Sequence, residues 1–536
     1  MKKHIFCLVL TGILLISVLG ACTPNNQPAT TPDTSAAPVT PTPVTPTPGA
    51  TPTVPPVPAN GATGSIVIAD EAEPPVIAPA RHASLHASYQ NSLNFNSLFR
   101  LNYSDLRPVP DLVESYRAIN DTTWEFTIFE GIRFHNGEEM TAYDVVASLL
   151  YVKNYPDAAA FQLSVVDAEV VDRYTLTIYT GTPNAMLFSD LLHQTHSIMP
   201  KSLIESGHDF LVQPIGSGPF VFETWNVGDS LVHTAFDDYF NPERAARIRE
   251  LTWRIIPEGA SRTIALEMGE IDYIVQVAAA DIPRMQEHPD IDLFFGTGTQ
   301  HNAILLNNDL PKFQDVRVRR AIDMAIDKEA VLLVGLEGFG TVVYNQVPIN
   351  FVGVSHEGEN RFDPEGAKAL LAETGIDPST LDFSLIASND ARVRMGEIIQ
   401  ANLAELGITV SIERMDLAAF MSATTEGRYE TAIANFTASN LLTFFNGMLH
   451  SRSIDGANRA RINVPEIDAL IDQAVVTIDE AARIAIYGEI TRLANENTGT
   501  IPLFQAMVVR AFSSNLAVPE TSATGALNVN MMYWRN

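Results

Sequence analysis

The stretch that decides the fold reads WEFTIFEGIRFHNGEEMTAYDV and occupies residues 124–145. Its beginning, together with the preceding Thr123, alternates polar and apolar side chains up to Ile128, which is the period of a half-buried strand. Gly137 then allows a tight turn that a side chain would obstruct. Thr141, with Asp144 three residues later, has the spacing of a helix N-cap, and apolar residues at helical spacing follow. A strand, a turn and a helix in close succession predict a mixed α/β protein.

The same alternation of strands and helices continues along the chain. The further elements that the pattern predicts are a strand over 174–179, a helix opened by Asp363-Pro364 and closed by Gly375, a helical stripe from Met395 to Leu406 ended by Gly407, a strand over 408–412, and a helix capped by Asp479. No internal repeat is visible in the sequence. Mixed elements of this kind predict sheets covered by helices.

The composition excludes some classes of function. At 536 residues the chain exceeds the roughly 100 to 200 residues that are usual for one domain. Its 46% hydrophobic and 18% charged residues are typical of a globular protein with an ample core. The formal net charge of -29 argues against binding to nucleic acid or adsorption to anionic lipid.

The first residues predict a secretory leader over 1–21. Lys2 and Lys3 precede an apolar run that is too short for a comfortable membrane span, and small residues then lead directly to Cys22. This end resembles the bacterial lipobox, whose cysteine becomes acylated. The only other cysteine, Cys7, lies inside the leader, so no internal disulfide competes for the Cys22 thiol.

Residues 22–63 form the next predicted segment, which consists mostly of Pro, Thr, Ala and Val. Such a composition cannot bury a core and favours extended polyproline II. At about 3.1 Å per residue, the segment could hold a domain on the order of 100 Å from a lipid anchor.

A search for catalytic motifs favours no enzyme. The patterns HExxH, GxxxxGKS/T, GxSxG and CxxC are absent from the sequence. Two pairs of histidines, His82/His86 and His193/His196, have the spacing of helical metal ligands, but neither has a cysteine or a third evident ligand beside it. We therefore expect no catalytic residue, no metal site and no cofactor.

Several segments, taken in order, resemble the large extracytoplasmic solute-binding proteins of peptide, dipeptide and nickel ABC importers. Residues 124–145 are similar to the family pattern W-x-F-x-L-R-x-G-V-x-F-x-D-G-x-x-x-T-A-x-D-V. The others are PIGSGPF at 214–220, GEID at 269–272, the stretch 307–328 with FQDVRVRRAIDMAIDK at its end, FDPEGAKALLAETG at 362–375 and AELGITV at 404–410.

This resemblance implies a two-lobe α/β fold of the periplasmic-binding-protein type (Venus flytrap, type II, large cluster) with an extra domain in the N-terminal half. By analogy, lobe I comprises 64–110, 212–303 and 497–536, the extra domain 111–211, and lobe II 304–496. The ligand is expected between the lobes, which close on it because it contacts both of them only in the closed form.

The resemblance also suggests ligand contacts. Peptide binders of this family carry a G-W-x-A-D segment, with an aromatic wall and an aspartate for the ligand's ammonium group, and the corresponding stretch here is NFTAS at 435–439. Phe436 keeps the aromatic, Thr437 follows, and Ser439 replaces the aspartate, so Glu73 is a candidate for the missing carboxylate. A peptide-like ligand, a sugar, a blocked peptide or a small chelate all remain open, and the Phe436 ring could equally belong to the core.

The function that the resemblance implies is solute capture for an ABC permease with its ATPase subunits. We expect a monomer, lipid-anchored through Cys22 on the outer face of the cytoplasmic membrane, that binds a peptide or other small molecule and no nucleic acid. A surface scaffold or chaperone on the same fold is the alternative class, and an enzyme is a weaker one.

Overall fold

A computed structural model of the chain describes residues 61–79, 85–103, 106–155, 164–519, 522 and 525–535. The predicted leader, Cys22, residues 22–60 of the predicted tether and His82 lie outside these residues. Within them, none of the helices combines the length and the apolar character needed to cross a membrane.

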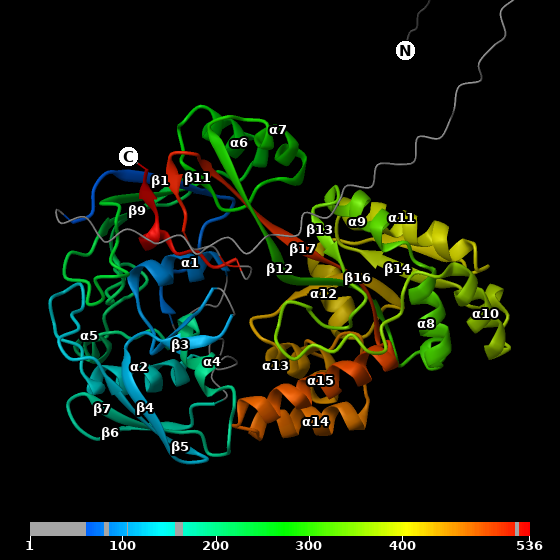
Figure 1. The fold of residues 1–536 in the computed structure, drawn as a ribbon, viewed down its shortest axis with the longest axis horizontal. Coiled ribbons are helices and arrows are strands. Elements are labelled where there is room, and N and C mark those ends of the chain that lie inside the picture. Colours follow the sequence, from blue (N-terminus) through cyan, green and yellow to red (C-terminus); the bar gives the residue numbers. More distant parts are fainter. Residues whose placement is uncertain are drawn as a thin grey trace, which may run out of the picture. The chain divides into compact units, whose positions relative to one another are not determined.

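One large mixed sheet organises the folded part (Figure 1). In the described residues its order is β15 (Val410–Arg414), β14 (Phe383–Ala387), β16 (Thr431–Thr437), β12 (Ile291–Leu306), β17 (Thr500–Ser513), β11 (Tyr273–Ile274), β1 (Ser65–Asp70), β10 (Glu250–Ile255), β9 (Ser230–Ala235) and β8 (Phe220–Asn226), and β13 (Gly340–Val342) pairs with β17. The strand β17, from the last part of the chain, thus lies between β12 and β11, which come from its middle.

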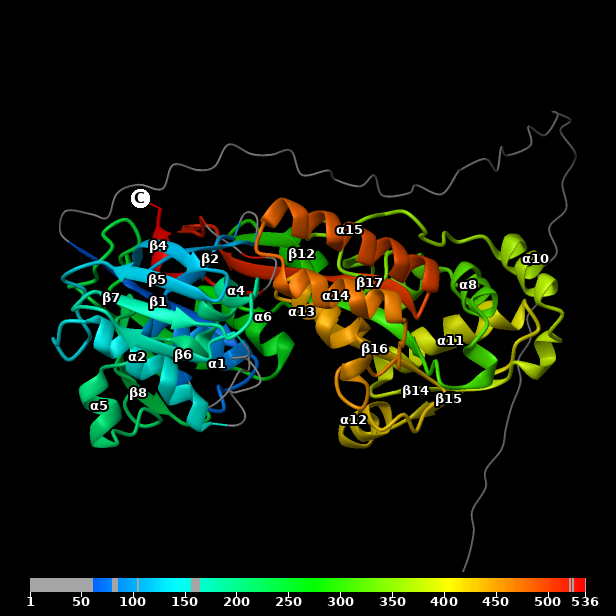
Figure 2. The same ribbon diagram turned by 90° about the horizontal axis from the view of Figure 1, so that it is seen from below.

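The half of this sheet that contains β15, β14 and β16, here called its C-terminal half, is covered by helices on both faces. One helical layer consists of α8 (Val316–Ala325), α9 (Lys328–Leu336), α10 (Pro364–Thr374) and α11 (Asp390–Ala404) (Figure 1). The other consists of α12 (Leu417–Thr425), α13 (Leu441–Phe444), α14 (Pro465–Val476) and α15 (Glu480–Asn497), all labelled in the view from below (Figure 2). Along β12, Ile304 and Leu306 join the first core, whereas Leu305 joins the second. Successive side chains of a strand point to opposite faces, so both faces are apolar here.

The N-terminal half of the sheet has its own cores. Ile66 and Ile68 of β1 pack with Trp253, while Ala69 faces a second cluster. The helices of this half are α1 (Leu85–Asn94), α6 (Gly259–Glu267) and α7 (Ile282–Gln286). The strands β12 and β17 extend from these cores to those of the other half, and their pairing shifts register after Thr297.

A smaller antiparallel sheet has the order β4 (Val113–Asn120), β5 (Thr123–Ile128), β7 (Thr175–Tyr179) and β6 (Asp167–Val170). It packs with α2 (Ala142–Tyr151) and α4 (Leu187–Leu191) around a separate apolar cluster, and α5 (Lys201–Ser206) follows. Two short ladders complete the description: β2 (Phe99–Leu101) with β3 (Pro108–Pro110), and β18 (Leu516–Ala517) with β19 (Tyr533–Trp534).

The elements predicted from sequence match this structure closely. The strand over 123–128 is β5. Asp144 accepts a hydrogen bond from the backbone N–H of Thr141, as the capping pattern predicts, and a second one from the Thr141 hydroxyl. The prediction for 408–412 is two residues early, because β15 begins at Val410. Gly407 is left-handed (φ +82°), and the N–H of Ile408 donates to the Leu403 carbonyl, so both residues close α11 instead of starting the strand.

Candidate functional site

A cavity of about 430 Å³ lies where segments from distant parts of the chain meet. It is lined by α1, the β2–β3 ribbon, residues 185–197 and residues 526–530 on one side, and by the start of α13, α15 and residues 351–352 on the other. Its volume falls in the range of small-molecule sites in proteins, which is about 300–1,000 Å³.

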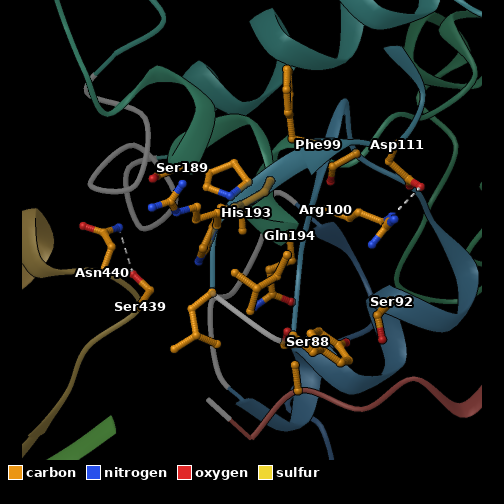
Figure 3. Close-up of a pocket in the computed structure, with 18 of the residues that line it drawn as sticks. Ser88, Ser92, Phe99, Arg100, Asp111, Ser189, His193, Gln194, Ser439 and Asn440 are labelled. Atoms are coloured by element: carbon orange, nitrogen blue, oxygen red, sulfur yellow. Dashed lines mark hydrogen bonds and ion pairs between the residues drawn. The ribbon is translucent and has the colours of Figure 1, made fainter. Parts of the chain in front are cut away.

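Helix α1 supplies hydrogen-bonding groups to the first wall. Ser88, Asn91 and Ser92 line the cavity at helical spacing, and the Asn91 amide donates to Gln194 Oε1 at 2.8 Å. Figure 3 shows Ser88 and Ser92 on this helix, with Gln194 beside them. The Asn91–Gln194 bond therefore fixes residues 192–197 against α1.

A buried carboxylate and two arginines form the charged part of the same wall. Asp111 is 8% exposed, accepts a hydrogen bond from Asn96 at 2.8 Å, and has Arg100 Nε at 3.8 Å from its Oδ1 (Figure 3). Burial raises the pKa of Asp111. The hydrogen bond from Asn96 and the charges of Arg244 and Arg100 act in the opposite direction and limit this rise. Arg244 also donates to Asn528 at 2.9 Å, so the chain near its C-terminus helps to hold this guanidinium.

His193 adds a neutral ring to the lining. Burial lowers the pKa of His193 to about 4, so the imidazole is uncharged at neutral pH. Its Nδ1 lies 3.0 Å from the Thr195 hydroxyl. The ring thus contributes polarity without charge.

The opposite wall begins where β16 ends. Asn440 is the N-cap of α13, with its side-chain oxygen accepting from Thr443 N at 2.8 Å, and Ser439 lies beside it on the same segment (Figure 3). On α15, Glu480 lies 3.4 Å from Arg107 Nη1, so an ion pair joins the two walls. Arg483 donates to the carbonyls of residues 477 and 478, which anchors its guanidinium at the start of α15.

The charges of the described lining favour an anionic group. Four arginines line the cavity (Arg100, Arg107, Arg244 and Arg483), against two acidic residues, Asp111 and Glu480. This excess is opposite in sign to the formal net charge of -29 of the whole chain. Guanidinium groups bind carboxylates through paired, charge-assisted hydrogen bonds.

The residues that the sequence singled out do not all meet in this cavity. Ser439 lines it, whereas Thr437 is exposed on β16 and lies outside its described lining. Phe436 packs edge-to-face on Phe444 at 5.5 Å and borders a separate, smaller cavity.

Glu73 makes hydrogen bonds within the folded chain. Its Oε1 accepts hydrogen bonds from Trp225 Nε1 at 2.8 Å and from the backbone N–H of Gly228 at 2.6 Å. The carboxylate thus holds the β8–β9 hairpin, and Glu73 is not among the residues described as lining the large cavity. The structure places Glu73 Oε1 against this hairpin, and the role of Glu73 as a substitute for the missing aspartate stays a prediction.

Most of the polar lining escaped the sequence reasoning. The four arginines, Asn528 and Asn530 come from segments that are far apart in sequence and match no short motif. His193 drew attention only through its spacing from His196. In the described residues, no group of three or more His, Cys, Asp or Glu side chains is placed to hold a metal ion.

Comparison with known proteins places this geometry in a family. A model described as "Bacterial extracellular solute-binding proteins, family 5 Middle" matches residues 107–455, more than half of the chain. Heme-binding protein A of Haemophilus influenzae is 26% identical over 456 residues, which is 78% of this chain and 82% of that protein. The dipeptide-binding protein of Escherichia coli is 24% identical over 432 residues, 73% of this chain and 80% of the relative.

The fold is shared as well. The structure of HbpA2 from Haemophilus parasuis superposes with a TM-score of 0.81 at 24% identity, and the match covers 88% of this chain and 100% of that one. The arrangement of two sheet halves joined by long strands is therefore the two-lobe α/β fold of periplasmic binding proteins. The chain belongs to the bacterial extracellular solute-binding proteins of family 5, and it is an extracytoplasmic substrate-binding protein of an ABC importer.

Proposed function

We propose that this protein captures a small solute with at least one carboxylate, such as a short peptide, in the large cavity and delivers it to an ABC permease. The observation that carries the proposal is the lining, which combines four arginines with hydrogen-bonding side chains from both walls. A relative is named for dipeptides, and a dipeptide carries a carboxylate at one end.

The two walls suggest how the solute is held. Arg100 and Arg244 belong to one wall and Arg483 to the other, so a ligand between them contacts both lobes at once. We propose the lobe boundaries implied by the sequence: 64–110, 212–303 and 497–536 for lobe I, 304–496 for lobe II, and 111–211 for the extra domain. The protein acts by binding and not by catalysis, and it works as a monomer.

The test of this function has two steps. Solute released by denaturing the purified protein is identified by mass spectrometry, and calorimetry then compares dipeptides that have a free C-terminus with the same dipeptides as C-terminal amides. We expect the amides to bind about fivefold more weakly, because a charge-assisted hydrogen bond is about 1 kcal/mol stronger than a neutral one. Equal binding of acids and amides, with no carboxylate in the released solute, would contradict the proposal.

We further propose that Cys22 carries lipid and that the Pro/Thr-rich segment tethers the folded part to the membrane. Cys22→Ala should abolish lipid attachment, so that the protein is either released or left with its leader uncleaved. Cell fractionation and the mass of the N-terminal peptide measure both effects. Cys7→Ala, inside the predicted leader, is the matched control and should leave anchoring intact. A Cys22→Ala protein that is processed and still membrane-bound would overturn this proposal.

A further inference from the structure

A second cavity of about 70 Å³ lies between the C-terminal half of the sheet and the helical segment that follows β16. In the β12–β16 pairing, His301 lies opposite Phe436 and Ala303 lies opposite Ala434, so all four side chains point to the same face. Two small alanines side by side leave space there, and Ala457 keeps the opposite wall short as well. The cavity therefore exists because the three alanines beside His301 are too small to fill the space.

His301 is the unusual member of this lining. It is 4% exposed, its ring packs edge-to-face on Phe444 at 5.8 Å, and neither ring nitrogen has a hydrogen-bond partner among the described residues. Arg459 also lines the cavity, and its buried Nε likewise has no hydrogen-bond partner among the described residues. Buried polar groups in folded proteins nearly always have a partner, so the missing one is expected to come from outside the chain.

The protonation state of His301 defines what that partner must offer. Burial lowers the pKa of the ring to about 3, and the nearby Lys328 charge acts in the same direction. The imidazole is neutral at physiological pH and presents one N–H donor and one nitrogen acceptor. Since a water molecule takes up about 30 Å³ of liquid, the space admits a group larger than a single water.

From these observations we propose that the small cavity is a binding subsite for a neutral group that both donates and accepts hydrogen bonds, a primary amide being the chemical type, with His301 and Arg459 as its partners. The group comes either as a free small molecule or as a side chain of the solute in the large cavity. The second source is a candidate because one segment borders both cavities: Asn435 and Phe436 line the small one, and Ser439 and Asn440 line the large one.

The test uses acetamide as the probe and the ring nitrogens of His301 as the reporter. In protein labelled with ¹⁵N-histidine, His301→Phe identifies the His301 resonances by their loss. We expect acetamide to shift these resonances in a saturable manner and to leave those of His233, a buried histidine of the other sheet half, in place. Acetone has the same shape but only accepts hydrogen bonds, and it should bind at least tenfold more weakly.

A cavity-filling variant separates the space from the chemistry. Ala457→Leu occupies the cavity from its half-exposed wall and leaves His301 in place, so it should weaken acetamide binding at least tenfold while the protein stays folded. A glutamine-containing dipeptide that shifts the same resonances at far lower concentration than acetamide would identify the solute as the source. No response of His301 to acetamide, an equal response to acetone, or undiminished binding in Ala457→Leu would overturn the proposal. The acetamide arm needs no ligand in the large cavity, so its result is independent of the proposed function.

Discussion

At the scale of single residues, Ser439 is where the large cavity lacks the charge that the family resemblance would place there. Ser439→Asp should strengthen binding of dipeptides with a free ammonium group about fivefold, because a charged partner adds about 1 kcal/mol over a hydroxyl. The same change should weaken any solute that has a carboxylate but no ammonium group, since it places an unpaired negative charge in the same cavity. Calorimetry measures both effects. Ser439→Asn, which adds bulk without charge, is the control, and no change in either class of ligand would show that Ser439 does not face the solute.

His233 gives a pH-dependent prediction at the same scale. It is fully buried, with Nε2 at 3.4 Å from the Asn94 amide nitrogen, and burial lowers its pKa to about 3. Below pH 6.5 His233 takes up a proton in the unfolded chain but stays neutral in the folded one. The free energy of unfolding therefore decreases as the pH falls from 6.5 toward 3. Between pH 7.5 and 5, His233 should therefore account for roughly 2 kcal/mol of lost stability. Urea midpoints should fall less steeply with pH in His233→Gln, and an unchanged slope would show that the ring is not held neutral.

At the scale of elements, the loop of residues 216–219 is fitted to the end of α1. A Cβ at Gly218 would lie 2.3 Å from the Leu93 carbonyl oxygen and 2.6 Å from the Phe95 nitrogen. Backbone atoms cannot move aside easily, so Gly218→Ala should lower the free energy of unfolding by about 1–3 kcal/mol. Gly488→Ala is the matched control, because in helix α15 its Cβ meets nothing closer than 3.8 Å and alanine favours helix by about 0.5–1 kcal/mol. Denaturant unfolding measures the free energy of unfolding of both variants. A loss of stability in Gly488→Ala, or none in Gly218→Ala, would refute this account.

At the scale of the whole molecule, β12 and β17 join two sets of cores, and the cavity lies between walls from both. A solute that contacts both walls shifts the equilibrium toward the closed arrangement by its difference in affinity for the two forms. Small-angle scattering should therefore give a smaller radius of gyration at saturation with the released solute than without it. A dipeptide that calorimetry shows not to bind is the control. Equal radii with and without bound solute would exclude closure.

The sequence by itself determined the elements and the family. The alternation at Thr123–Ile128, the Thr141–Asp144 cap and the Asp363 and Asp479 caps depend on neighbours within a few residues, so local physics decides them before the chain folds. The order of the similar segments from 124 to 410 was enough to indicate the solute-binding family. The domain boundaries and the lipid on Cys22 stay predictions.

Only the tertiary structure decided which side chains line the large cavity. The four arginines come from residues 100, 107, 244 and 483, and no local pattern predicts that β2, a segment after β9 and helix α15 meet at one cavity. Glu73 shows the same dependence: the sequence suggested a ligand contact from its charge, and only the fold shows Trp225 and Gly228 bonded to one oxygen of its carboxylate. Hydrogen bonds and ion pairs between distant segments depend on how sheets and helices pack, and packing is a property of the whole chain that no stretch of sequence carries alone.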